Sequence, residues 1–240
     1  MDSLLKDKKT EDIGKMFDDI APGYDFLNHF LSFTIDKFWR AKLIRLLQKE
    51  NPAHILDVAT GTADLALMTA KRLPQANITG IDIAEKMLEK GRKKVNKKNA
   101  ANRIELCKAN AENLPFADNA FDAVMVAFGV RNFQHLHTGL NEMLRVAKPG
   151  KKIFILEFSK PTGVFKLIYN AYFRLYLPLA GRLISGNKKA YQYLHDSVIA
   201  FTEGDGFLDI MEQNGYCNTS LRRLSGGIAT IYTGEKEKII

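Results

Sequence analysis

The chain has 240 residues, of which 46% are hydrophobic and 26% are charged, with 17 glycines and 7 prolines. This is the composition of a packed globular protein, and it excludes collagen-like, low-complexity and disordered chains. The two cysteines, Cys107 and Cys217, lie far apart without a partner pattern, which argues against a disulfide scaffold or a zinc site and is compatible with a reducing cytoplasm.

The net charge of +8 calls for an anionic partner or a solvated basic face. Six cations lie close together in the sequence: Arg92, Lys93, Lys94, Lys97, Lys98 and Arg103. We interpret them first as the solvated end of a helix, and weak attraction to anionic lipid is the alternative. The sequence has no nucleic-acid-binding motif, so we expect no nucleic acid partner.

The N-terminal region, residues 1–50, predicts two or three helices that form a lid. Pro22 and Gly23 interrupt the helical pattern, and residues 38–50 are clearly amphipathic. The first 30 residues carry charges throughout, and no apolar run approaches the roughly 18 residues of a membrane-spanning helix. We therefore expect no signal peptide and a soluble, cytoplasmic protein.

The middle of the chain alternates between apolar runs and helical stretches. The runs are residues 54–60, 77–83, 104–110, 121–128 and 151–159. Several are apolar at consecutive positions, which is typical of strands buried on both faces of a parallel sheet. The alternation predicts a doubly wound α/β sheet with its core at residues 51–160. Pro149-Gly150 is expected to end the third helix before its strand.

The last third of the chain begins with an aromatic, cation-spaced segment at residues 164–184. We expect residues 161–203 to form a helical insertion that faces the substrate or the membrane, and a buried helical cap is the alternative. Residues 204–240 predict a helix near 204–214 and two strands joined as a hairpin at Gly226-Gly227. No linker or repeat divides the chain, so we expect a single domain over residues 1–240.

In an open parallel sheet, ligands bind outside the carboxyl ends of the strands. After the first strand, small residues at 59, 61 and 63 allow a tight turn and the close approach of a ligand. The turn lacks the phosphate-loop Gly-Lys-Ser/Thr and the GxGxxG spacing, which disfavours a nicotinamide cofactor.

Two further strand ends suggest a nucleoside, and a third carries a cation. Asp82 ends the second strand 21 residues after Gly61, where a carboxylate can accept both hydroxyls of a ribose, although it can also cap the next helix. Asn110-Ala111 follows the third strand and can read an adenine edge, or it can form an ordinary polar turn. Arg131 follows the fourth strand, where it is either a functional cation or a structural partner of an acid.

Together these residues resemble the seven-stranded, Rossmann-like methyltransferases that depend on S-adenosylmethionine. The segments that carry a narrower resemblance are ILDVATGTADLAL, NAENLPFADNAFD, FGVRNF, EMLRVAKPG and LEFSKP, with AxxYDxxN at 21–28 and SGGIATIYTG at 225–234. They are similar to the UbiE/MenG family of quinone-biosynthesis C-methyltransferases, which act on demethylmenaquinone and, in some members, on a ubiquinone precursor. The match runs through most of the chain.

The resemblance implies a role for each matching position. Gly61, Thr62 and Asp57 would contact the cofactor, Asp82 would hold its ribose, and Asn110 with Ala111 would contact its adenine side. Many members have a serine at position 127, where this chain has Ala127, so no hydroxyl is available there. We further hypothesise that Arg131 is catalytic, by stabilising the oxyanion or orienting the base or a water that takes the proton, and that Tyr24, as a lid residue, and Asn132 contact the substrate. No metal is expected.

The implied reaction transfers a methyl group from S-adenosylmethionine to a ring carbon of demethylmenaquinol, which gives menaquinol. The alternatives are methylation of a ubiquinone precursor or another lipidic phenol, and a non-catalytic protein that binds or escorts a quinone. An isoprenoid quinol substrate further implies a peripheral contact with the inner face of the cell membrane. The sequence leaves the formation of a homodimer open.

Overall fold

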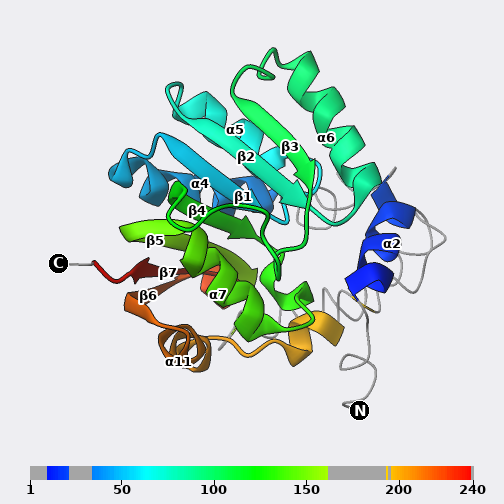
Figure 1. Cartoon of the computed structure of the whole chain (residues 1–240). Coiled ribbons are helices and arrows are strands. Elements are labelled where there is room, and N and C mark those ends of the chain that lie inside the picture. The colour runs from blue at the N-terminus through cyan, green and yellow to red at the C-terminus, as the bar shows by residue number, and fades with distance from the viewer. Residues whose placement is uncertain (1–9, 22–33, 162–192, 194–195, 239–240) are drawn as a thin grey trace.

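The computed structural model describes residues 10–21, 34–161, 193 and 196–238. Within them the strands form one seven-stranded sheet in the order β3-β2-β1-β4-β5-β7-β6 (Figure 1). The strands are β1 (His54–Val58), β2 (Asn77–Asp82), β3 (Ile104–Lys108), β4 (Phe121–Ala127), β5 (Ala147–Phe158), β6 (Tyr216–Leu224) and β7 (Ala229–Lys236). The predicted doubly wound α/β fold with seven strands is confirmed.

The strand order reverses between β1 and β4. Strands β1 to β5 pair in parallel, with β2 and β3 on one side of β1 and β4 and β5 on the other, whereas β7 is antiparallel to both β5 and β6. A crevice at such a switch point, outside the carboxyl ends of the strands, is where open α/β sheets bind ligands.

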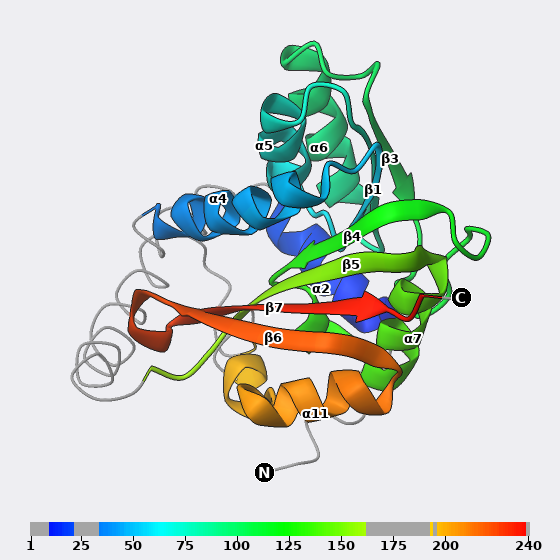
Figure 2. The same ribbon diagram turned by 90° about the vertical axis from the view of Figure 1, so that its left-hand side faces the viewer.

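Helices cover both faces of the sheet (Figure 2). They are α4 (Ile35–Leu47), α5 (Asp64–Arg72) and α6 (Glu85–Lys97) on one face, and α7 (Leu136–Val146) and α11 (Asp205–Gln213) on the other. Because successive strand residues point to opposite faces, Ile55 and Met125 pack under the first layer while Leu56 and Val124 pack under the second. Strands buried on both sides explain the continuous apolar runs in the sequence.

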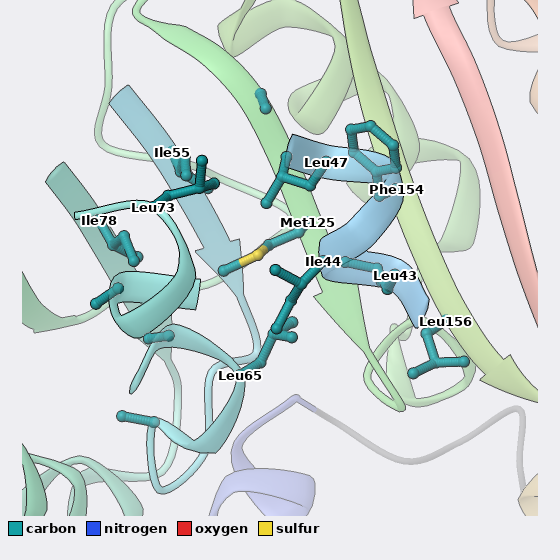
Figure 3. Close-up of a cluster of buried hydrophobic side chains, with 14 of the residues drawn as sticks. Leu43, Ile44, Leu47, Ile55, Leu65, Leu73, Ile78, Met125, Phe154 and Leu156 are labelled. Carbon is teal, nitrogen blue, oxygen red and sulfur yellow. The ribbon is translucent and has the colours of Figure 1, made fainter. Parts of the chain in front are cut away.

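The helix α4 is anchored by one apolar stripe. Leu43, Ile44 and Leu47 recur at helical spacing, are fully buried, and pack toward Met125 and Phe154 of the sheet (Figure 3). Each such side chain contributes about 2 kcal/mol through its burial. This stripe fixes the other residues of α4 relative to the carboxyl edge of β1.

The strand β5 corrects one predicted boundary. The sequence predicted a strand at 151–159 after a helix stop at Pro149-Gly150, but α7 ends at Val146 and β5 begins at Ala147. The register against β4 shifts here, because Phe121 pairs with Ala147 whereas Ala123 pairs with Lys152. Proline cannot donate to a strand ladder, so it lies in this irregular stretch, where Gly150 has a φ of 72°.

The two ends of the chain follow the predicted pattern where the structure describes them. The helix α2 (Thr10–Ile20) and α4 lie in the N-terminal region, and α11 precedes the hairpin of β6 and β7, whose turn η5 (Ser225–Gly227) contains the predicted glycine pair. The aromatic segment at 164–184 lies outside the described residues. Among those described, no helix is long and apolar enough to cross a membrane. The subdivision of residues 1–240 into lid, core, insertion and closing elements stays a prediction.

Candidate active site

A pocket opens at the carboxyl ends of β1 to β4, beneath α2. Its walls come from the turn after β1, the ends of β2 and β4, the segment after β3, and α2, which contributes Ile13 and Phe17. Figure 1 shows α2 beside the beginning of α6. The pocket lining includes the predicted site residues Gly61, Asp82, Asn110, Ala111 and Asn132. The structure thus brings five of the predicted residues to one place.

The turn after β1 is built from left-handed backbone conformations. Ala59, Gly61 and Ala63 have φ values of 51°, 57° and 66°. Such a conformation is free for glycine and costs an alanine about 1 kcal/mol. Between them, the Thr60 amide donates to the carbonyl of Ile81 at 2.8 Å, which ties the turn to β2. The tight turn that the small residues predicted is confirmed.

Asp57 is a buried carboxyl group on β1, two residues before this bend. It is 1% exposed, and it accepts a hydrogen bond of 2.6 Å from the Thr60 hydroxyl. Burial raises the pKa of Asp57 to about 7, and the Thr60 hydrogen bond and the charge of Arg40 only partly oppose that shift. A cation placed nearby would favour the ionised form.

Asp82 uses both carboxylate oxygens to organise the site. One oxygen accepts from the Gly61 amide at 2.8 Å and the other from the Ala84 amide, just before α6, at 2.9 Å. Burial raises the pKa of Asp82, while these two amides oppose the rise. The capping contact weighed in the sequence is therefore present, and so is a second contact to the turn. Asp82 lines the pocket, and a carboxylate has about four acceptor positions, which is more than these contacts use.

Asn110 and Ala111 form a compact turn after β3. The Asn110 side-chain oxygen accepts from the Glu112 amide at 3.0 Å, which fixes the side chain against its own turn. Ala111 is 8% exposed and packs in the second core layer. The polar-turn alternative is thus observed, and both residues also line the pocket.

A smaller polar hollow adjoins the pocket. The two share Ala59, Gly61 and Ala127, and the hollow is also lined by Thr62, Asp57 and Arg40. Thr62 is 3% exposed and its hydroxyl accepts from the Lys94 ammonium at 3.0 Å. Thr62 and Asp57 therefore face the hollow instead of the main pocket.

Arg40 of α4 is a site residue that the sequence analysis missed. It is 9% exposed, its guanidinium carbon lies 5.3 Å from the centre of the Phe128 ring, and its Nε is 3.5 Å from a carboxylate oxygen of Asp36. Within the described part of the chain, that Nε makes no hydrogen bond. The sequence could have indicated this residue, because Arg40 is a cation on the apolar face of a helix. It lies three residues before Leu43, four before Ile44 and seven before Leu47.

Arg131 forms the buried ion pair that the sequence left as an alternative. Its guanidinium donates to Glu157 at 2.6 Å and to the carbonyl of Phe128 at 2.6 Å, and it lies 5.2 Å from the centre of the Phe158 ring. The side chains of Arg131 and Glu157 are 6% and 0% exposed. Arg131 is absent from the pocket lining, whereas its neighbour Asn132 is present. Tyr24 lies outside the described residues.

The sequence matches the model of the ubiE/COQ5 methyltransferase family over residues 4–236. This chain belongs to the ubiE/COQ5 methyltransferase family. The family resemblance inferred from the sequence motifs is therefore confirmed, and so is the methyltransferase class of the chain.

Relatives within the ubiE/COQ5 family match along almost their whole length. The ubiquinone/menaquinone biosynthesis C-methyltransferase UbiE of Geotalea daltonii is 48% identical over 231 residues, which are 95% of this chain and 98% of that protein. The demethylmenaquinone methyltransferase of Bacteroides fragilis is 42% identical over 230 residues, which are 95% of this chain and 94% of that protein.

Solved structures share the fold of this ubiE/COQ5 family member. The cyclase SpnF has a TM-score of 0.71 at 16% identity, with 97% of this chain and 98% of that chain covered. An S-adenosylmethionine-dependent methyltransferase from Thermotoga maritima has a TM-score of 0.65 at 16% identity, with 92% of this chain and 100% of that chain covered. At these identities the likeness concerns the fold, and the cyclase illustrates that one fold supports different reactions.

Proposed function

We propose that this protein transfers a methyl group from S-adenosylmethionine to a ring carbon of demethylmenaquinol. The observation that carries the proposal is the junction of two cavities with different polar groups at the turn after β1. The pocket holds the carboxylate of Asp82, and the hollow combines Arg40 with Asp57. The family membership and the names of the relatives support the same activity.

The pocket suits the nucleoside half of the cofactor. Asp82 is held from two sides by backbone amides, so its remaining lone pairs have a fixed direction toward a ribose diol. Asn110 and Ala111 lie further along the same wall, where a polar edge and a small side chain suit adenine. Phe17 of α2 covers this part of the pocket from the opposite side.

The hollow suits the amino-acid half of the cofactor, which carries a carboxylate and an ammonium group. The buried guanidinium of Arg40 is a partner for the carboxylate, and Asp57 is a partner for the ammonium. Ala59, Gly61 and Ala127 border both cavities, so the sulfonium group would lie beside them. Three residues with small side chains leave room for that group at the backbone.

The cofactor supplies a methyl group that its sulfonium activates toward displacement. The protein then has to align the quinol ring carbon with that methyl group, exclude water, and stabilise the ring oxygen as it loses its proton. Phe128, Phe133 and Asn132 form the side of the pocket that remains for the ring. The proposal that Arg131 or Tyr24 contacts the ring directly stays a prediction.

The test is a methyl-transfer assay with the purified chain, methyl-labelled S-adenosylmethionine and reduced demethylmenaquinol. We expect labelled menaquinol, and we expect less product from a demethylated benzoquinol with the same prenyl chain. A preference for the benzoquinol would support the ubiquinone-precursor alternative. Cofactor binding without any transfer to either quinol would contradict the proposal and favour the escort protein. Accumulation of demethylmenaquinone in cells that lack the protein provides the matching test in vivo.

We propose further that the protein works in the cytoplasm, in peripheral contact with the inner face of the cell membrane. The isoprenoid tail of the substrate is insoluble, so the ring has to be taken from a lipid surface. The exposed apolar side chains of Ile35 and Phe38 at the beginning of α4 and the net charge of +8 support this contact. Whether a homodimer forms is a matter for sedimentation measurements.

A further inference from the structure

Tyr193 contacts a residue of the pocket from a distant part of the chain. Its hydroxyl donates a hydrogen bond of 2.9 Å to the side-chain oxygen of Asn132, which lies 61 residues earlier. Tyr193 is 7% exposed, and burial raises its pKa. The phenol therefore stays protonated at neutral pH and acts as a hydrogen-bond donor.

This hydrogen bond determines which end of the Asn132 amide points where. On its other side, the amide nitrogen of Asn132 donates to the carbonyl of Phe128 at 3.4 Å. That carbonyl can only accept, so the nitrogen has to face it and the oxygen has to face Tyr193. This orientation leaves the second N–H of the amide outside these two hydrogen bonds, and Asn132 lines the pocket.

The backbone beneath Asn132 is strained and needs support. Phe128 has a φ of 62°, which is unusual for an aromatic residue and costs on the order of 1 to 2 kcal/mol. Its carbonyl accepts from both Arg131 and Asn132, and the buried Glu157 holds Arg131 through its guanidinium and its backbone amide. Glu157 thus holds the turn at Phe128 through Arg131, and Tyr193 holds the side chain of Asn132.

Ser197 connects the two parts of this arrangement. Its hydroxyl accepts from the Nε of Arg131 at 3.3 Å, and it lies four residues after Tyr193. Residues 196–200 are helical, and Ser197 and Tyr193 are four positions apart in the sequence. The same short segment therefore contacts both Arg131 and Asn132.

We propose that Tyr193 is a positioning residue for methyl transfer, because its hydroxyl locks the amide of Asn132 with the nitrogen available to the substrate oxygen. This inference rests on the proposed function, since the oxygen belongs to the quinol ring. The hydroxyl of Tyr193 donates to Asn132, which lies on the side of the pocket assigned to the quinol ring. Its loss should consequently affect turnover and leave cofactor binding intact.

The experiment compares Tyr193→Phe with Tyr216→Phe. Tyr216 is a matched control, because it is 3% exposed and its hydroxyl donates to the carbonyl of Leu140 at 2.8 Å, in the core beside α7. We expect Tyr193→Phe to lower kcat about ten-fold while the Kd for S-adenosylmethionine changes less than two-fold. Tyr216→Phe should lower the Tm and leave kcat unchanged.

A double-mutant cycle with Asn132→Ala separates positioning from simple packing. If Tyr193 acts through Asn132, then Tyr193→Phe should cause no further loss of kcat in the Asn132→Ala background. Multiplicative losses, an unchanged kcat in Tyr193→Phe, or an equal loss of kcat and cofactor affinity would each overturn the inference. Absence of transfer by the unmodified chain would instead contradict the proposed function, so the two failures are distinguishable.

Discussion

Two residues at the carboxyl edge of the sheet approach each other so closely that only a glycine fits. A Cβ atom added to Gly129 would lie 2.6 Å from the Cβ of Ala59 and 3.0 Å from Cγ2 of Val126. Ala59 cannot yield easily, because it begins the strained turn after β1 and has a φ of 51°. This contact joins the β1 and β4 sides of the strand-order switch.

We predict that Gly129→Ala lowers the free energy of unfolding by about 1 to 3 kcal/mol, because it overpacks this contact. Adding Ala59→Gly should restore part of the loss, since it removes one partner of the clash and relieves the left-handed backbone. Val126 remains close, so the recovery should be incomplete. Urea unfolding of the two single variants and the double variant measures the effect, and a double variant no more stable than Gly129→Ala would show that Ala59 is not the obstacle.

The role of Asp82 in cofactor binding can be tested against Asp122, a second carboxylate that accepts from two backbone amides. Asp82→Asn places an amide N–H₂ against one of two backbone N–H donors and removes the charge, so we expect the Kd for S-adenosylmethionine to rise at least ten-fold, or about 1.4 kcal/mol. Asp122→Asn is the control, because Asp122 accepts from the amides of Ala53 and His54 at the opposite edge of the sheet. Both variants should melt earlier, but isothermal titration should find weaker binding only for Asp82→Asn.

Asp57 predicts a pH dependence of stability with a definite sign. Its pKa is about 7 in the folded chain, whereas an aspartate in an unfolded chain has a pKa of about 4. The folded state therefore binds this proton more tightly, and the contribution of Asp57 to the free energy of unfolding falls as the pH rises from about 4 to 7 and is level above that. The difference in unfolding free energy between the unmodified chain and Asp57→Asn should fall by about 1 kcal/mol per pH unit in this window. A flat or rising difference would show that Asp57 is ionised when folded.

Residue spacing along the chain predicted some of this site and missed the rest for a physical reason. That Gly61 and Asp82 belong to one site could be predicted, because one helix and one strand of ordinary length separate them in the sequence. In the structure the Gly61 amide donates directly to Asp82. The ion pair between Arg131 and Glu157 could not be predicted, because Glu157 lies on β5 and only the pairing of β4 with β5 brings it beside Arg131. The hydrogen bond from Tyr193 to Asn132 has no local motif at all.

At the scale of elements, α2 depends on side-chain contacts to stay over the pocket. Asp18 accepts from the Lys86 amide at 2.7 Å, so α2 supplies a cap to the beginning of α6 from outside that helix. At its other end, the amide of Thr10 donates to the side chain of Gln134 at 2.8 Å. Between these contacts, Ile13 and Phe17 form the pocket wall.

We predict that Asp18→Ala releases this helix and increases the dissociation rate of S-adenosylmethionine several-fold, since the lost cap contributes about 1 kcal/mol. Asp19→Ala is the control, because Asp19 is exposed on the same helix. Stopped-flow displacement of the bound cofactor measures both rates. Equal rates for the two variants would mean that Asp18 does not hold α2 in place.

The elements themselves followed from apolar patterns more reliably than their ends did. The five apolar runs became β1 to β5, and the runs of β1 and β4 are nearly continuous because strands covered on both faces need uninterrupted apolar residues. The beginning of β5 was misplaced, since Pro149-Gly150 is a common helix stop and nothing local shows that a neighbouring strand will pair with Ala147 across a register shift. Pairing with β4, and not the local helix-stop pattern, therefore determines where β5 begins.

At the scale of the whole molecule, the basic cluster in α6 and the segment that follows it is partly neutralised. Arg92 pairs with Glu85 at 2.6 Å, Lys94 pairs with Asp64, and Arg103 donates to the carbonyl of Ala70 at 2.8 Å. Lys93, Lys97 and Lys98 remain exposed. Some cations of the cluster therefore stabilise contacts within the fold, and the others form a basic surface.

We predict that the chain floats with vesicles that contain anionic lipid, and that replacing Lys93, Lys97 and Lys98 by glutamine weakens the partition by about 1 kcal/mol per lysine. Neutral vesicles reveal any purely apolar contribution. Raising the salt concentration should reduce binding to the anionic vesicles. No flotation at any lipid charge would contradict the proposed membrane contact.

The strand β7 pairs with β5 but lies near the end of the sequence, and this order affects how the chain folds during synthesis. Among the described residues, the edge of β5 that faces away from β4 pairs with β7, whose residues 229–236 leave the ribosome some 70 residues after residue 158. During that interval a long apolar strand presents unpaired backbone groups, which is a risk for aggregation in a nascent chain. Because the β6–β7 hairpin is local, it can form quickly once it emerges and dock as a unit, so translation speed over the intervening codons should influence the soluble yield.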